Sequence, residues 1–368
     1  MRTFLCTAGE IWGGVEQCVL VLARGLRDSG RHVEVGVFHE GLLAQRLRAA
    51  GVPARLLRAR GRYDIGAAVD LRRALVEERI DVLHTHGYRA TIAGAMGSAG
   101  LPVRLVRTMH GLPERPASLA GLPRYWRLKL NAALESLASA CAADGVAFVS
   151  AELHDAFARG RGTSRVVRNG IDAAAIAERS AWWPKRGLSR FRAGIAGRIT
   201  AVKGHRFAAA ALARLPLLPV DLHVFGSGPL EAELREQCRV LRIEDRVVFH
   251  GFEPRMGDRF ASLDALLLPS IHEGLPYTML EAMCAGVPVI ASRTGGMTEV
   301  VERSGGGVLV PPGDEQALAA AIERLAVSPD LCAQLGARGR AYVRGAFLAS
   351  HMVQAYVGLY EELRPVAS

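Results

Sequence analysis

The stretch from Asp264 to Ser292, DALLLPSIHEGLPYTMLEAMCAGVPVIAS, decides the fold. Two short apolar runs without alternation, Ala265–Pro269 and Val287–Ala291, predict strands of a parallel sheet that is covered on both faces. A helix is predicted between them, with Pro276 in its first turn and Gly286 just past its end. The stretch therefore predicts a strand–helix–strand unit, and ligands of such sheets bind at the carboxyl ends of the strands.

Two carboxylates lie near the carboxyl end of the first of these strands. Glu273 is in the loop that follows the strand, and Glu281 is about one turn inside the helix. At this spacing both side chains can face one crevice and accept hydrogen bonds from vicinal hydroxyl groups. Taken alone, the spacing favours the simpler interpretation of a solvated loop residue and a helix-capping residue.

The residues around these carboxylates favour a function over that simpler interpretation. They resemble the signature of the retaining glycosyltransferases of family 4, in the motifs Glu273-Gly274-Leu275-Pro276, Leu280-Glu281-Ala282-Met283 and Gly286-Val287-Pro288-Val289. The resemblance implies that Glu273 contacts the transferred sugar and that Glu281 holds the nucleotide ribose. It also implies that Gly274 and Leu275 belong to the donor-binding loop.

Strand and helix patterns alternate along the whole chain of 368 residues, which is long enough for two domains. The expected fold is α/β, with two Rossmann-like, doubly wound parallel-sheet domains. The resemblance implies the GT-B architecture, in which these domains face each other across a cleft. The expected boundaries are an N-terminal, acceptor-side domain over residues 1–172, a linker over 173–190, a nucleotide-sugar-binding domain over 191–345 and a C-terminal helix over 346–368 that packs back toward the N-terminal domain.

The formal net charge of +10 indicates affinity for anions such as nucleotide diphosphates, anionic lipid surfaces or nucleic acid. No recognisable nucleic-acid-binding motif is present, so nucleic acid is not an expected partner. The six cysteines contain no C-x-x-C pair and indicate core residues in a reducing cytosol. No window of about 20 residues is free of charges or helix breakers, so we expect a cytoplasmic protein, soluble or peripheral on the inner face of the membrane.

Two cations follow the first strand of the second half. Arg198 and Lys203 lie in the loop Gly197-Arg198-Ile199-Thr200-Ala201-Val202-Lys203-Gly204, before a predicted helix. At a helix start they could bind a diphosphate through charge-assisted hydrogen bonds of roughly 1.5–3 kcal/mol each. Exposed basic loop residues are the alternative, but the pattern matches the diphosphate-binding loop of the family that the chain resembles.

The first half contributes its own candidates at strand ends. Gly13 and Gly14 open a helix, where bare backbone amides could receive a phosphate, although a tight turn would use glycines too. His110 resembles the family's histidine near the donor sugar; a strand-end histidine satisfied within the fold is the alternative. His84 and His86 could suggest a metal, but no third ligand is evident in the sequence, and we prefer a structural or acceptor-contacting role.

A basic and aromatic segment, Gly121–Leu130, begins a helix in the first half. Arg124, Arg127 and Lys129 accompany Tyr125 and Trp126, a composition that suits the headgroup boundary of an anionic membrane. An amphipathic helix that covers the sheet is an equally good interpretation. Peripheral contact with an anionic membrane is therefore one of two alternatives for this segment.

These candidates together predict a reaction. The sequence contains no D-x-D pair to hold a divalent metal, so Arg198, Lys203 and helix-start amides would neutralise the leaving diphosphate. We expect a metal-independent hexosyltransferase without a cofactor, using a nucleotide-diphosphate sugar and a glycan, lipid-linked or small-molecule acceptor, in bacterial polysaccharide, lipopolysaccharide or glycolipid synthesis. Retention of the anomeric configuration is implied by the resemblance. The alternatives are a sugar-nucleotide epimerase of the same architecture and a non-catalytic sugar-nucleotide-binding protein.

Overall fold

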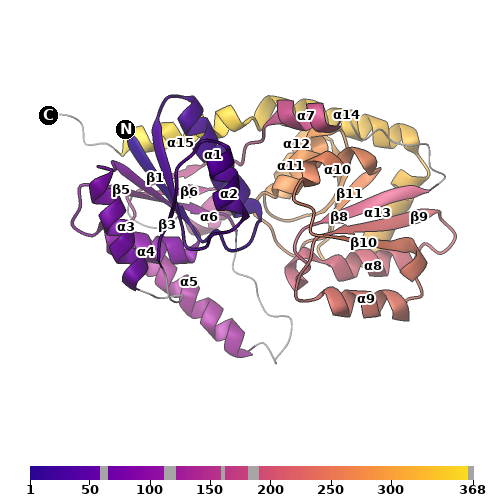
Figure 1. Cartoon of the computed structure of the whole chain (residues 1–368). Coiled ribbons are helices and arrows are strands. Elements are labelled where there is room, and N and C mark those ends of the chain that lie inside the picture. Colours follow the sequence, from indigo (N-terminus) through magenta and orange to yellow (C-terminus); the bar gives the residue numbers. More distant parts are fainter. Residues whose placement is uncertain (59–64, 112–121, 159–161, 181–189, 364–368) are drawn as a thin grey trace. The chain divides into compact units, whose positions relative to one another are not determined.

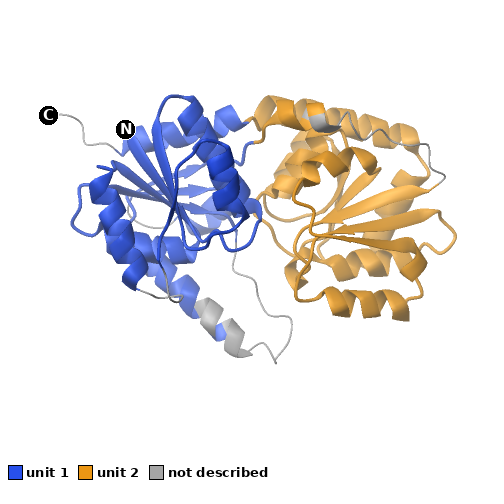
Figure 2. Ribbon diagram, viewed as in Figure 1, with its two compact units in different colours: residues 1–170, 349–368 blue, residues 171–348 orange. Residues whose placement is uncertain are grey.

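The computed structural model describes residues 1–58, 65–111, 122–158, 162–180 and 190–363. The chain forms two compact units: Met1–Gly170 with Ala349–Ser368, and Ile171–Leu348 (Figure 2). The C-terminal segment therefore belongs to the first unit, although the second unit precedes it in the chain.

The first unit contains a parallel sheet with the strand order β3-β2-β1-β4-β5-β6-β7 over its described residues. The strands are β1 (Arg2–Thr7), β2 (His32–Val37), β3 (Ala54–Leu56), β4 (Val82–His86), β5 (Arg104–Met109), β6 (Gly145–Phe148) and β7 (Thr163–Val166). Thr7, the last residue of β1, lies opposite Val37 of β2 and His86 of β4. The carboxyl ends of these three strands are thus level with one another.

Helices cover both faces of this sheet, as the unbroken apolar strands require (Figure 1). Helices α1 (Gly14–Asp28), α2 (Leu42–Ala49) and α15 (Ala349–Glu362) pack together, and α3 (Ile65–Glu77), α4 (Tyr88–Ser98) and α5 (Leu122–Ala142) form a second group; α6 (Ala151–Phe157) lies beside β6 and β7. Gly25 of α1 allows the close approach of α15, because a Cβ atom there would meet Val353 at 2.3 Å. The last helix of the chain is therefore built into the first unit.

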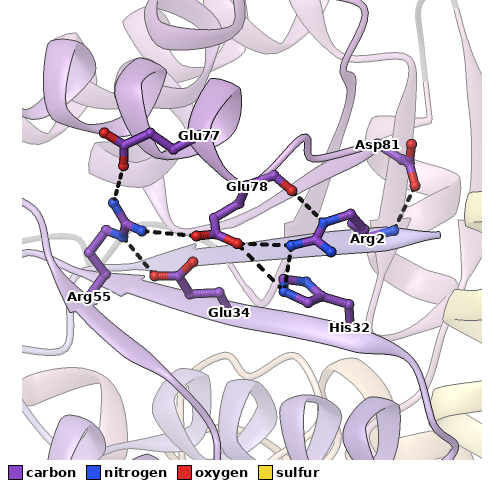
Figure 3. Close-up of polar contacts among 7 residues, drawn as sticks. All are labelled: Arg2, His32, Glu34, Arg55, Glu77, Glu78 and Asp81. Carbon is purple, nitrogen blue, oxygen red and sulfur yellow. Dashed lines mark hydrogen bonds and ion pairs between the residues drawn. The ribbon is translucent and has the colours of Figure 1, made fainter.

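A network of ion pairs closes the amino ends of the strands in this unit (Figure 3). Glu78 accepts from Arg2 at 2.8 Å and lies 3.5 Å from Arg55, which also pairs with Glu34 at 2.7 Å and Glu77 at 2.9 Å. These charges lie at the edge of the sheet opposite the carboxyl ends. In α/β sheets ligands bind at the carboxyl ends, so we assign the network to the fold rather than to function.

The second unit contains a parallel sheet with the strand order β10-β9-β8-β11-β12-β13 in the part that the structure describes. The strands are β8 (Phe191–Ala196), β9 (Val220–Phe225), β10 (Val247–Gly251), β11 (Ala265–Leu268), β12 (Val289–Ser292) and β13 (Gly307–Val310). The order reverses between β8 and β11, which are hydrogen-bonded neighbours. Together the two sheets confirm the prediction of two doubly wound parallel-sheet domains.

Helices again form two groups, one for each face of the sheet (Figure 1). One group is α8 (His205–Ala213), α9 (Glu231–Val240) and α13 (Glu315–Ala326); the other is α7 (Ala173–Ser180), α10 (Met256–Arg259), α11 (Tyr277–Cys284), α12 (Gly295–Ser304) and α14 (Pro329–Ala346). The structure has helix α7 where the sequence predicted a linker without an element, residues 173–190. Residues 181–189 of that predicted linker lie outside the described residues.

Helix α11 is the helix of the deciding stretch, and its ends are set by Pro276 and Gly286. Pro276 occupies the N-cap position, one residue earlier than predicted, and the helix begins at Tyr277. Gly286 adopts a left-handed φ of +81° just past the last turn, as the sequence predicted. These two helix-terminal residues therefore place Glu281 inside α11 and leave Glu273 in the loop before it.

No described helix is both long enough and apolar enough to cross a bilayer.

Candidate functional site

The predicted site residues of the second unit follow strands at its topological switch point. Arg198 comes two residues after β8, and Glu273 comes five residues after β11. Because β8 and β11 are neighbours whose outward connections run in opposite directions, their loops diverge and leave a crevice outside the strand ends. The strand order thus brings the predicted cation loop and the predicted carboxylate loop to one edge of the sheet.

Lys203 and Glu273 are in direct contact at this edge. The ammonium group of Lys203 donates to Oε1 of Glu273, and Ser270 Oγ donates to the same oxygen at 3.1 Å. The side chain of Glu273 is 13% exposed and that of Lys203 is 32% exposed, so the pair is only partly screened by solvent. The sequence assigned these residues separately, one to the diphosphate and one to the sugar, and did not predict that they pair.

Two glycines allow the loops to approach each other so closely. Gly204, at φ +71°, follows Lys203, and a Cβ atom there would lie 2.0 Å from the carbonyl oxygen of Pro269. Gly295, at φ +54°, opens α12, and a Cβ atom there would lie 1.8 Å from the carbonyl oxygen of Glu273. The backbone of the Glu273 loop is thus held against two neighbouring elements.

The donor-binding loop is itself well fixed. The backbone N–H of Gly296 donates to the carbonyl oxygen of Gly274 at 2.6 Å, and both Gly274 and Leu275 are buried. Glu281 is half-buried in α11, and Arg198 is exposed without an ion pair to any described residue. The guanidinium group of Arg198 is therefore fully available to an anionic ligand, whereas the ammonium group of Lys203 would be shared between such a ligand and Glu273.

In the first unit, the Gly13-Gly14 turn starts α1 as predicted, with Gly13 at the N-cap and Gly14 exposed. The backbone N–H groups of Gly13 and Glu16 donate to the buried carboxyl group of Glu16. Burial raises the pKa of Glu16 more than these hydrogen bonds lower it, and the pKa is raised to about 7. Part of the helix start that we expected to receive a phosphate is thus occupied by Glu16, which the capping pattern of a Glu three residues after the N-cap could have revealed.

A buried polar cluster lies where β4 and β5 end. His84 Nδ1 is 2.6 Å from the hydroxyl group of Tyr360, and its Nε2 is 2.7 Å from Oγ1 of Thr108. Tyr356 contributes a hydroxyl group 2.9 Å from the same Oγ1. The two tyrosines come from α15, so the C-terminal helix completes the hydrogen bonding of a fully buried histidine.

His86 and His110 form a second contact beside this cluster. Nδ1 of His86 lies 2.9 Å from Nε2 of His110. Burial lowers the pKa of His110 to about 4, with a further contribution from the positive charge of Arg107, and burial also lowers the pKa of His86. Both rings are neutral at pH 7, so His110 acts at that pH as a hydrogen-bonding group without charge.

Cys18 supplies the third potential metal ligand that the sequence did not reveal. It projects from α1, and the ligand atoms of Cys18, His86 and His110 all lie within 4.8 Å of one another. A sulfur and two imidazole nitrogens are a donor set that suits zinc. The two histidines are hydrogen-bonded to each other, however, and a metal ion could bind both only by replacing that bond. That the reaction needs no metal stays a prediction from the sequence.

The basic segment that we considered for membrane contact lies at the start of α5. Trp126 is exposed there. The side chains of Arg124, Arg127 and Lys129 lie outside the described residues, so the membrane alternative remains a prediction.

Comparison with known proteins gives matches along most of the chain. Residues 190–327 match the family described as glycosyl transferases group 1, and residues 12–175 match glycosyltransferase family 4. The chain is 30% identical over 342 residues to the 2-deoxystreptamine N-acetyl-D-glucosaminyltransferase of Streptomyces fradiae, covering 83% of this chain and 80% of that protein. It is 33% identical over 177 residues to the lipopolysaccharide core biosynthesis glycosyltransferase LpsD of Rhizobium meliloti, covering 48% of each.

The 2-deoxystreptamine glucosyltransferase of Streptomyces kanamyceticus is 34% identical over 175 residues, 46% of this chain and 45% of that protein. The chain thus spans about half the length of these last two relatives. Among solved structures, HepE of Anabaena in complex with UDP-glucose superposes with a TM-score of 0.84, at 23% identity, over 98% of this chain and 100% of that one. A sucrose-phosphate synthase of Thermosynechococcus elongatus gives a TM-score of 0.80 at 21% identity, over 99% of each chain.

Proposed function

The chain belongs to glycosyltransferase family 4, with its group 1 domain and GT-B fold, and from this premise we propose that it is a retaining, metal-independent enzyme that uses a nucleotide-diphosphate sugar. The acceptor class that we propose is a glycan, a lipid-linked glycan or a small molecule, in bacterial cell-surface polysaccharide or glycolipid synthesis. Support comes from relatives named for lipopolysaccharide core, colanic acid and amylovoran synthesis. We propose a cytoplasmic location, with the inner face of the membrane as the place of any lipid-linked acceptor.

The single observation that carries the donor assignment is the Lys203–Glu273 pair at the switch point of the second unit. An ammonium group and a carboxylate that lie together at the carboxyl ends of the strands suit a ligand that has a diphosphate next to a polyol. Arg198 and Lys203 would bind the diphosphate, Glu273 the hydroxyl groups of the transferred sugar, and Glu281 the ribose. Solved structures of HepE hold UDP, and we propose a uridine nucleotide as the first donor to test.

The chemistry that we propose is a front-face displacement. The bond between the anomeric carbon and the diphosphate oxygen breaks, and the acceptor oxygen bonds to the same face of that carbon. The acceptor proton passes to the departing phosphate oxygen, so no protein nucleophile is required. Arg198 and Lys203 stabilise the negative charge that develops on the diphosphate, which is the role of fixed cations in such transition states. His110 contributes a neutral hydrogen bond to the sugar.

Metal independence rests on the sequence, which offers no D-x-D pair to bind a divalent ion against the diphosphate. The two fixed cations would take over that task. Full turnover in the presence of EDTA is the expected result, and loss of turnover that manganese restores would contradict it.

A direct test is to incubate the purified protein with UDP-, GDP- and ADP-sugars and a panel of acceptors, and to measure release of the nucleoside diphosphate. The proposal predicts release that depends on an acceptor, and a product with the anomeric configuration of the donor by nuclear magnetic resonance. Conversion of the donor into its epimer without an acceptor would instead identify an epimerase. Binding without any conversion across the panel would indicate a sugar-nucleotide-binding protein.

A further inference from the structure

His86 has a buried ring nitrogen that no described residue satisfies. The residue is 1% exposed, its Nδ1 faces Nε2 of His110 at 2.9 Å, and its Nε2 has no hydrogen-bond partner among the described residues. The neighbouring His84 differs, because both of its ring nitrogens are paired. The partners of His84 are hydroxyl groups, which can donate or accept, so they allow either tautomer of that ring. The unpaired nitrogen of His86 instead restricts the tautomer of His86.

A neutral imidazole carries one proton, so either His86 or His110 donates in their shared hydrogen bond. If His110 donated through Nε2–H, then Nδ1 of His86 would accept and the proton of His86 would lie on its unpaired Nε2. That arrangement buries an N–H donor without an acceptor, which is rare in proteins and costly. If His86 donates through Nδ1–H, its unpaired Nε2 is only a bare acceptor, which is the less costly arrangement.

The choice at His86 fixes the proton of His110. When Nε2 of His110 accepts from His86, the proton of His110 must lie on Nδ1. His110 is half-buried, and its Nδ1 forms no hydrogen bond with a described residue. That nitrogen is therefore the one through which the ring can donate to a ligand.

We infer that His86 is a positioning residue that holds His110 as the Nδ1–H tautomer, so that His110 donates a hydrogen bond to an oxygen of the donor sugar, a role that rests on the proposed transfer reaction. The sugar oxygen that His110 contacts then acts as an acceptor. His86 itself does not touch the substrate.

The test separates the tautomer from the reaction. Long-range ¹H–¹⁵N correlation spectra of the whole protein at pH 7.5, without substrate, distinguish a protonated from a bare ring nitrogen. The signals of His110 are assigned among the 11 histidines by their loss in His110→Gln. The expected wild-type pattern has the proton on Nδ1, and a proton on Nε2 of His110 would overturn the inference.

Two substitutions of His86 test its control over that proton. His86→Leu removes the donor, and we expect His110 to lose its exclusive Nδ1–H pattern. His86→Asn places an amide N–H at the same number of bonds from the backbone as Nδ1, and should restore the pattern. A His110 pattern that stays unchanged in His86→Leu would refute the role of His86.

Kinetics then test the positioning role. In His86→Leu we expect kcat to fall about tenfold or more, while the Kd of the free nucleoside diphosphate stays within about twofold. His86→Asn should recover part of kcat, and an unchanged kcat in a folded His86→Leu would overturn the inference. His154→Leu is the matched control, since His154 of α6 pairs with Asp155 of the same helix and with Ser164 of β7, and should leave both the His110 signals and kcat unchanged. If no donor is turned over by the wild type, the proposed function fails, and the spectra still decide the tautomer.

Discussion

Glu273→Gln separates nucleotide binding from sugar transfer. The carboxylate of Glu273 has two partners, the ammonium group of Lys203 and the hydroxyl group of Ser270. An amide oxygen can still accept from Ser270, but it carries no charge to pair with Lys203. The substitution therefore keeps the shape of the side chain and releases the ammonium group for the diphosphate.

The two effects have opposite signs. Exposed ion pairs are worth about 0–1 kcal/mol, and this pair is only partly exposed, so releasing Lys203 should tighten binding of the free nucleoside diphosphate by up to about 1 kcal/mol, roughly fivefold in Kd. The sugar loses charged hydrogen bonds worth about 1.5–3 kcal/mol, which corresponds to a fall of roughly 10- to 150-fold in kcat/KM.

The assay combines titration calorimetry with the nucleoside diphosphate and initial rates with the full donor. Glu236→Gln is the matched control, because Glu236 forms an exposed ion pair with Arg239 on α9 and should change neither quantity. A loss of nucleoside diphosphate affinity of tenfold or more in Glu273→Gln would contradict the assignment of Glu273 to the sugar. It would mean that Glu273 serves the nucleotide or the fold rather than the sugar.

Three further predictions concern stability, measured by denaturant unfolding. Gly204→Ala combines a left-handed φ with a Cβ atom 2.0 Å from a carbonyl oxygen and should cost about 2–4 kcal/mol. Gly30→Ala, at φ +73° with no described atom within 4 Å of the new Cβ, should cost only about 1 kcal/mol, and equal costs would contradict the close approach at Gly204. Burial lowers the pKa of His205 from its ordinary 6.5 to about 4. The neutral ring therefore contributes to stability above pH 6.5, and this contribution, roughly 3 kcal/mol, is lost as the pH falls to about 4. A difference in unfolding free energy between wild type and His205→Phe that stays constant between these pH values would contradict this prediction. Tyr360→Phe leaves the buried Nδ1 of His84 without its hydrogen-bond partner and should lower the free energy of unfolding by about 1–3 kcal/mol. Tyr342→Phe should change it little, and similar losses in the two variants would argue against the buried cluster.

Residues at helix ends and short apolar runs predicted much of the fold. Gly286 was placed just past its helix because a left-handed residue is needed there, and the apolar strands on either side were found from their length and composition. Pro276 was placed one residue late, because an N-cap and a first helical residue both tolerate a missing N–H group. The helix at Ala173–Ser180 was missed; its short sequence, AAAIAERS, carries a weak apolar pattern beside a segment that matched no element.

The pairing of site residues could not be predicted in the same way. Lys203 and Glu273 are 70 residues apart, and their contact depends on β8 and β11 being neighbours and on the absence of a Cβ atom at Gly204. Cys18 lies near His86 and His110 because α1, which carries it, packs against β1 and β2. Strand order and helix packing arise from the whole fold, and local sequence patterns do not specify them.

Isothermal titration of the wild type and Glu281→Ala with UDP, GDP and ADP and their sugar conjugates, in the presence and absence of EDTA, tests the nucleotide-sugar site itself. We expect one nucleotide to bind equally well with and without EDTA. We also expect Glu281→Ala to weaken binding of that nucleotide by about 1–3 kcal/mol, the loss expected when charged hydrogen bonds to the ribose are removed. Failure of every nucleotide to bind, or equal affinity in Glu281→Ala, would contradict the assignment of a nucleotide-sugar site to the strand ends of the second unit.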